Sequence, residues 1–326
     1  DRWTEALEKF NRKLKLVRGN NPVDPNLASF RFITKAKLKH DIEQFRYMER
    51  LSLGPKGLSK LVQLYEALDK EIEWPDGDSI AVPLTGSQLD LIRNSYNRPF
   101  HLVEAPEFFG STLNRDLDVN SITYDYMDNA PGMTYFDNLL KPEVLDTLRR
   151  VLLESTIWFD FSYPGGYLGA MLADGLACPL LFQIAKDLRQ TFPEIFKNHQ
   201  LMQLWAYKYD SRLTGINIHA DSAAVNVNFW ITPNTANLNP NNGGLVVYKA
   251  KAPMDWEFKQ YNAGGKKGHD RIREFLTEND SGKMVVPYNE NRIVLFNSSL
   301  FHETDAFEFK QGYENRRINV TFLFGG

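Results

Sequence analysis

The second half of this chain is a series of short β-rich stretches, and this pattern restricts the possible folds more than any other feature. The stretches are rich in Val, Ile, Phe, Tyr and Trp, and clusters of Gly, Asn and Pro separate them. Many short strands with turns between them are typical of a β-sandwich or β-barrel. Because helical patterns precede the strands and do not alternate with them, a doubly wound parallel sheet is disfavoured. The expected strands are residues 201–209, 216–221, 224–232, 244–250, 283–286, 292–297 and 317–324.

Helical periodicity dominates the first 75 residues. Apolar side chains recur at helical spacing over 33–51 and 58–72, with Gly54 and Pro55 as the break between the two stretches. The pattern predicts an N-terminal helical region over residues 1–75. Such a helical hairpin can belong to a helical-repeat array, although a single hairpin shows no repeat period. Residues 76–132 contain several prolines without a sustained period, and we expect a connector packed on the core there.

From Met133 onward the pattern changes again. Residues 133–136 predict a strand, 142–155 a helix with Pro142 in its first turn, and 168–191 a second helix. We therefore expect three parts: residues 1–75, 76–132 and 133–326.

The charge and cysteine content exclude several classes of protein. The net charge is −3, so no global positive charge suggests a nucleic acid as partner. The single cysteine, Cys178, excludes an internal disulfide and metal sites built from several thiolates. The longest apolar stretch, 167–185, is interrupted by Asp174 and Pro179, and the first five residues lack a signal-peptide core. We expect no membrane partner and a cytoplasmic location.

Three residues on the predicted strands could hold a metal ion. His219 and Asp221 lie two residues apart, which places them on the same face of a strand with Asn217. His302 ends the β-rich run that starts at Arg292 and could supply a third ligand. Two histidines and one carboxylate with open positions form the facial triad that suits Fe(II) and oxygen chemistry. For any single histidine, a structural role is the alternative.

The last strand carries a candidate anion-binding arginine. Arg317, Asn319 and Thr321 share one face, opposite apolar side chains that must pack against a core. An arginine inside a barrel is costly without an anionic partner, and its planar guanidinium binds a carboxylate in bidentate fashion. A dicarboxylate cosubstrate would suit it. The alternatives are an outward-facing Arg317 and, as a second choice, Arg316.

His219-Ala-Asp221, His302 and Arg317, in this order and on predicted strands, resemble the Fe(II)- and 2-oxoglutarate-dependent oxygenase superfamily, in its prolyl-hydroxylase-like branch. Residues 133–144 look like the start of such a catalytic domain, and the resemblance covers about residues 133–325.

This resemblance implies an α+β fold with a double-stranded β-helix (jelly-roll, cupin-like) catalytic core, supporting helices and the N-terminal helical region. It implies iron bound by His219, Asp221 and His302, and 2-oxoglutarate bound to iron with its far carboxylate on Arg317. Oxygen would then oxidise 2-oxoglutarate to succinate and CO2 while an unactivated C–H bond is hydroxylated. With a carboxylate at Asp221, hydroxylation is favoured over halogenation.

Further cosubstrate contacts also follow from the resemblance. Tyr209 is the expected tyrosine before the His-x-Asp pair, with Tyr207 as second choice. Asn228 and Trp230 lie on the strand face that should line the pocket. Similar enzymes often carry Ser or Thr two residues after the arginine, where this chain has Asn319.

The substrate stays open between two classes. A peptide or protein side chain is slightly favoured by the prolyl-hydroxylase-like pattern, and a free amino acid or natural-product intermediate is the alternative. A non-catalytic helical and β-barrel interaction protein is a second alternative, and a metal-dependent isomerase would leave Arg317 without a role. Residues 264–268 predict a mobile loop or substrate lid, and His269 is expected in a polar loop without a ligand role.

Overall fold

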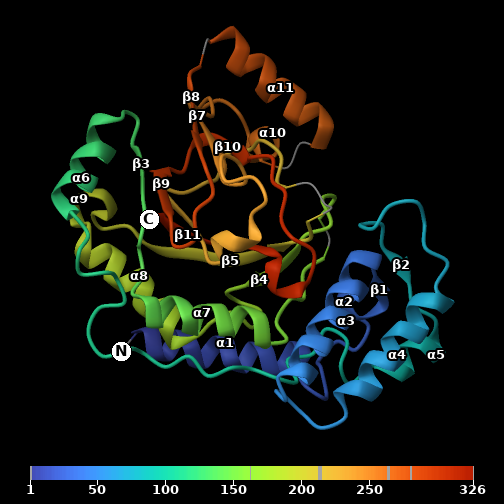
Figure 1. Cartoon of the computed structure of the whole chain (residues 1–326). Coiled ribbons are helices and arrows are strands. Elements are labelled where there is room, and N and C mark those ends of the chain that lie inside the picture. The colour runs from blue at the N-terminus through green and yellow to red at the C-terminus, as the bar shows by residue number, and fades with distance from the viewer. Residues whose placement is uncertain (1, 162, 212–214, 263–264, 280, 326) are drawn as a thin grey trace.

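The computed structural model describes residues 2–161, 163–211, 215–262, 265–279 and 281–325. Two antiparallel sheets form the centre of the molecule. The larger sheet has six strands in the order β3-β9-β6-β11-β5-β4, and the smaller has three in the order β10-β7-β8. In Figure 1 the smaller sheet lies above the larger one, and helices cover the larger sheet from below.

The strand boundaries agree with most of the sequence expectations. The larger sheet contains β3 (Met133–Phe136), β4 (Leu168–Met171), β5 (Gln200–Tyr209), β6 (Val225–Trp230), β9 (Ile293–Asn297) and β11 (Arg317–Gly325). The smaller sheet contains β7 (Leu245–Lys251), β8 (Lys283–Val286) and β10 (Leu300–Thr304), and β1 (Phe32–Ile33) pairs with β2 (Val82–Pro83) near the N-terminus.

The longer N-terminal helices are α1 (Arg2–Arg18), α3 (Lys35–Arg50) and α4 (Leu58–Glu71), with the single-turn α2 (Ala28–Arg31) between the first two. The central helices are α5 (Gly86–Ile92), α6 (Val119–Asp128), α7 (Pro142–Glu154), α8 (Pro179–Thr191) and α9 (Pro193–Phe196). The helices α10 (Phe258–Tyr261) and α11 (Gly265–Glu278) lie between β7 and β8, and two 3-10 turns complete the set at Asn234–Ala236 and Tyr313–Asn315. No helix among the described residues is long and apolar enough to cross a membrane.

The alternation of side chains along β6 and β11 explains how the larger sheet has one dry face and one polar face. Val227 and Phe229 of β6 and Val320 of β11 are fully buried in the same hydrophobic core as α7 and α8. Because successive side chains point to opposite faces, Asn228 and Arg317 then point away from these helices. The sequence expectation about the two faces of the last strand is confirmed.

The N-terminal helices share this core. Leu14 of α1 and Phe45 of α3 belong to the same buried cluster as the sheet. Arg18 of α1 makes a bidentate ion pair with Asp174, at 2.6 and 2.5 Å. On the side of the sheet that faces α3, Arg316 pairs with Glu43 at 2.9 Å. The helical region therefore supports the sheet from behind.

Three local expectations are wrong. Residues 168–178 are not helical. Leu168–Met171 is an edge strand that pairs with β5. The helix α8 begins only at Pro179, and this proline occupies its first turn. Gly169 lies close to the ring of Tyr207, where a Cβ would be 3.2 Å away. This close packing between β4 and β5 is a tertiary contact that helical periodicity does not reveal.

Residues 216–221 do not form a strand; His219 only makes an isolated bridge with His302. The connector contains α5 and α6, which are ordinary short helices started by Thr85 and Asp118 as N-caps. The predicted loop at 264–268 is instead the start of α11, whose apolar Ile272 and Leu276 are buried; Gly264 itself lies outside the described residues.

Candidate metal centre and active-site cavity

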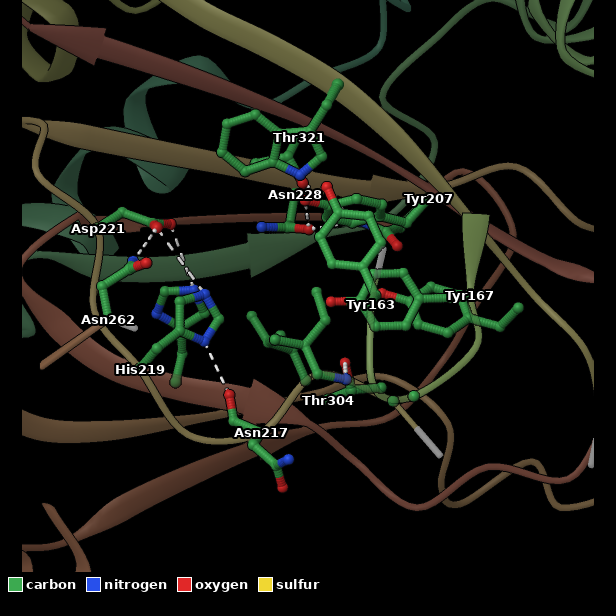
Figure 2. A pocket seen from close by; sticks show the side chains of 18 of the residues that line it. Tyr163, Tyr167, Tyr207, Asn217, His219, Asp221, Asn228, Asn262, Thr304 and Thr321 are labelled. Atoms are coloured by element: carbon green, nitrogen blue, oxygen red, sulfur yellow. Dashed lines mark hydrogen bonds and ion pairs between the residues drawn. The ribbon is translucent and has the colours of Figure 1, made fainter. Parts of the chain in front are cut away.

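A cavity of about 660 Å³ opens on the polar face of the larger sheet. Residues of β5 and β11 form its floor, His302 and Thr304 of β10 line another side, and the α10–α11 segment contributes Phe258, Asn262 and His269. Figure 2 shows His219, Asp221 and Asn262 on one side of the cavity, and Tyr163, Tyr167 and Tyr207 on the other.

His219, Asp221 and His302 come together at one side of this cavity. One ligand atom from each residue lies within 4.8 Å of the others. The Nε2 atom of His219 is 3.8 Å from Oδ1 of Asp221, and Nε2 of His302 is 3.5 Å from Oδ2. Two imidazole nitrogens and a carboxylate at these separations can hold one metal ion.

Both histidine rings are held so that the same nitrogen faces the carboxylate. The Nδ1 atom of His219 is 2.8 Å from the carbonyl oxygen of Asn217, and Nδ1 of His302 is 3.0 Å from that of Leu300. A carbonyl oxygen only accepts, so in the neutral form of each ring Nδ1 carries the proton and Nε2 keeps a lone pair. These backbone bonds orient both Nε2 atoms toward the Asp221 carboxylate.

Burial, reinforced by the neighbouring His219, lowers the pKa of His302 to about 4. His302 is only 3% exposed, and the charged form of a ring so deeply buried is disfavoured by the loss of hydration. His302 is therefore neutral at pH 7, and metal binding does not have to displace a proton from it.

Asparagine side chains hold the Asp221 carboxylate. Asn226 donates to Oδ2 at 2.8 Å, and Asn262 donates to Oδ1 at 3.2 Å. The amide of Asn228 donates in turn to Asn226 at 2.9 Å. Asn319 and Thr321 of β11 both donate to Oδ1 of Asn228. A chain of hydrogen bonds thus runs from Asp221 along the floor of the cavity.

Arg317 is held at the bottom of the cavity by two glycine carbonyls. Its Nε donates to the carbonyl oxygen of Gly243 at 2.7 Å and its Nη2 to that of Gly244 at 3.1 Å. A Cβ at Gly244 would lie 1.9 Å from the carbonyl oxygen of Val286, so only glycine fits there. The Gly-Gly pair before β7 therefore allows the backbone to reach the guanidinium.

Two buried donors beside the metal site have no partner among the described residues. Nη1 of Arg317 and the hydroxyl of Tyr209 make no hydrogen bond, and Arg317, at 2% exposure, has no carboxylate within 4.0 Å in the described part of the chain. Burial lowers the pKa of Arg317, but a guanidinium stays charged in proteins. Burial raises the pKa of Tyr209 to about 12, so its hydroxyl keeps its proton. The pair offers an anion two donors and one positive charge.

The other predicted site residues are placed less uniformly. Asn228 and Asn319 line the cavity, but the Asn319 amide already donates to Asn228 and to Thr321, at 3.1 and 3.2 Å. Trp230 is not among the described residues that line the cavity. Its ring lies against the Arg317 guanidinium, 5.7 Å from the Cζ atom, and packs on Tyr288. Trp230 therefore supports the arginine from outside the cavity.

Sequence reasoning missed several lining residues. Tyr163 and Tyr167 stack with ring centroids 4.4 Å apart, and Tyr207 donates to the Tyr163 hydroxyl at 3.1 Å. Tyr163 and Tyr167 come from a segment that is assigned to no motif, and only the Pro164-Gly165-Gly166 sequence marks a turn there. Tyr207 is the second-choice tyrosine of β5. His269 is expected in a polar loop without a ligand role, but it lies on α11 and lines the cavity.

No protein-family model and no curated protein matches this chain. Similar solved structures include non-haem α-ketoglutarate-dependent enzymes and prolyl hydroxylases. One is SnoK, a non-haem α-ketoglutarate-dependent carbocyclase from nogalamycin biosynthesis, with 9% identity, a TM-score of 0.44, and 67% of this chain and 87% of SnoK covered.

A Pseudomonas putida prolyl-4-hydroxylase is similar at 13% identity and a TM-score of 0.41, with 64% of this chain and 99% of the hydroxylase covered. HygX from Streptomyces hygroscopicus, solved with nickel, 2-oxoglutarate and hygromycin B, is similar at 15% identity and a TM-score of 0.42, with 66% and 87% covered. These values describe distant similarity, and the geometry of the site carries the function proposed below.

Proposed function

We propose that this protein is an Fe(II)- and 2-oxoglutarate-dependent dioxygenase that hydroxylates an unactivated C–H bond. In this proposal residues 133–326 form a double-stranded β-helix oxygenase domain, and residues 1–75 and 76–132 form its supporting helical region and connector. The observation that carries the proposal is the unpaired, buried guanidinium of Arg317 in the same cavity as His219, Asp221 and His302.

The donor set fits iron. Two imidazole nitrogens and one carboxylate leave open positions for a cosubstrate and oxygen, and they suit Fe(II). When bound, the iron would supply the activation of oxygen that couples the oxidation of 2-oxoglutarate to succinate and CO2 with hydroxylation of the substrate. The protein would contribute fixed ring orientations through the backbone carbonyls of Asn217 and Leu300, and a carboxylate held by two amides.

The anion site fits the far carboxylate of 2-oxoglutarate. Nη1 of Arg317 and the hydroxyl of Tyr209 are donors without an acceptor, and a carboxylate would accept from both. Of the described residues that line the cavity, Asp221 alone is acidic. A hydrolase or isomerase that uses the same three ligands would have no need for this buried charge, whose isolation costs several kcal/mol.

The substrate proposal keeps two candidates. A peptide or protein side chain is the first, as the prolyl-hydroxylase-like sequence pattern suggests. A free amino acid or natural-product intermediate is the second. The aromatic wall of Tyr163, Tyr167, Tyr207 and Trp205 favours this second candidate, because it offers ring surfaces to a compact ligand inside the cavity.

The test is formation of succinate from 2-oxoglutarate by the full chain with added Fe(II), measured with and without 2-oxoglutarate and after chelation of the metal. We expect metal-dependent succinate formation that His219→Ala abolishes and that an exposed change, Arg93→Ala, leaves intact. Equal turnover in His219→Ala would contradict the site. A protein that binds neither metal nor 2-oxoglutarate would instead be the non-catalytic interaction protein.

A further inference from the structure

The described residues between β7 and β8 (252–262, 265–279 and 281–282) pack against the segment that carries His219 and Asp221. On α11, Ile272 and Leu276 are buried. They form a separate hydrophobic cluster with Ile218, Ala220 and Phe301. We call these described residues the β7–β8 insertion. Figure 1 shows its two helices, α10 and α11, at the end of the molecule opposite α1 and α7.

Three hydrogen bonds join the end of α10 to the ligand segment. The backbone N–H of Ala220 donates to the carbonyl oxygen of Tyr261 at 3.0 Å. The side-chain amide of Asn262 donates to the carbonyl oxygen of Ala220 at 2.7 Å and to Oδ1 of Asp221 at 3.2 Å. Residues 216–221 form no strand ladder, but they pair with the sheet side through the bridge at His219 and through the bonds from the Thr304 N–H to the carbonyl oxygen of Ile216 and from the Asp221 N–H to that of Ser298. The insertion adds its own hydrogen bonds at Ala220 and at the Asp221 side chain.

The two carboxylate oxygens of Asp221 accept hydrogen bonds from two different parts of the chain. Oδ2 accepts from Asn226, a fully buried residue of β6, whereas Oδ1 accepts from Asn262 of the insertion. Each oxygen also faces a different histidine, with Oδ1 toward His219 and Oδ2 toward His302. Loss of either amide would free the carboxylate to rotate about its terminal bond, and the ligand atom would then be less well aligned with the two Nε2 atoms.

The same insertion also touches the space that a substrate would occupy. Phe258, Asn262 and His269 line the cavity. Asn262 therefore lines the cavity, and its side-chain amide donates a hydrogen bond to the Asp221 carboxylate. Any displacement of the end of α10 would therefore move the amide group that donates to Asp221.

We propose that Asn262 is a positioning residue for the metal centre, and that the β7–β8 insertion is in this way part of the metal site. This inference rests on the metal centre of the proposed function. Partners that orient a ligand typically change metal affinity by 10- to 100-fold when they are removed. Removal of Asn262 should therefore weaken metal binding without unfolding the protein, because Asn262 is only half-buried.

The experiment is titration of the metal-free full chain with Co(II), followed by the visible absorption bands of the bound ion, which report both affinity and coordination geometry. The variants are Asn262→Ala and Asn226→Ala. The matched control is Asn279→Ala, an exposed asparagine of the same insertion whose amide donates to the carbonyl oxygen of Phe275. We expect about 10-fold or greater loss of Co(II) affinity and altered bands in both test variants, and wild-type behaviour in the control. Thermal unfolding of the metal-free proteins checks folding, and Asn262→Ser replaces the alanine variant if that one fails to fold.

Wild-type Co(II) affinity and bands in Asn262→Ala, with weakened binding in Asn226→Ala, would overturn the role of Asn262. Equal weakening in Asn279→Ala would also overturn it, because the effect would then come from general loosening of the insertion. The titration needs no 2-oxoglutarate, so the two proposals fail separately. Weakened Co(II) binding without any succinate formation would leave this inference standing and refute the dioxygenase.

Discussion

Arg317→Met separates the proposed cosubstrate site from the stability of the sheet. Methionine keeps an unbranched chain of similar length but has no donor and no charge. The replacement would remove the two bonds to the carbonyl oxygens of Gly243 and Gly244 and the unpaired Nη1. We expect 2-oxoglutarate binding to be lost while the protein remains folded.

The magnitude follows from the single free donor. A hydrogen bond to a charged group contributes about 1.5–3 kcal/mol, which corresponds to about 10- to 150-fold in the dissociation constant. Two effects on the ligand-free protein oppose each other. Removal of a buried, unpaired charge is favourable by several kcal/mol, whereas two carbonyl oxygens lose their donor at about 1–3 kcal/mol each. The melting temperature without ligand should therefore change little.

The assay is calorimetric titration of the Mn(II)-loaded protein with 2-oxoglutarate in the absence of oxygen. Arg316→Met is the matched control, because Arg316 points away from the cavity and pairs with Glu43 and Asp210 at 2.9 and 3.3 Å. The control should lose stability but keep its affinity for 2-oxoglutarate. The reasoning is refuted if Arg317→Met binds 2-oxoglutarate within twofold of the wild type, or if Arg316→Met loses affinity equally.

Two further predictions concern the packing around the site and the buried charges behind it. Gly244→Ala should lower the free energy of unfolding by about 1–3 kcal/mol or more, because the new Cβ would overlap the carbonyl oxygen of Val286. Urea unfolding measures this loss, and Gly86→Ala, which has open space around its Cβ position, should show none. Burial holds the pKa of His40 well below 6.5. The unfolded chain therefore takes up a proton first as the pH falls below 6.5, and stability declines by up to about 1.4 kcal/mol per pH unit. For His40→Phe, the free energy of unfolding measured in urea should depend less on pH between pH 6.5 and 5 than it does for the wild type. Equal pH dependence in the variant and the wild type would contradict a role of His40.

The candidate metal ligands and the arginine could be selected from the sequence because strand periodicity is a local property. Side chains two residues apart share a face whatever the rest of the chain does, so Arg317 and Asn319 could be placed on the polar face of the last strand. The order of His219, Asp221 and His302 then gave the family resemblance. The structure brings these three residues together, although residues 216–221 form no strand ladder and are held by the bridge at His219, by backbone hydrogen bonds to Thr304 and Ser298, and by the insertion.

The rest of the site was decided by contacts between residues far apart in the sequence. Trp230 has the parity of a lining residue, but its ring packs on Tyr288 and against the Arg317 guanidinium, and it is not among the described residues that line the cavity. Asn262 and His269 come from a segment whose glycines and lysines indicated a loop. They reach the cavity because Ile272 and Leu276 bury α11 against Ile218 and Phe301. The sequence alone determined which residue types alternate along each strand. Only the tertiary structure decided which of them share one cavity, because the free energy of burial depends on partners that local periodicity does not specify.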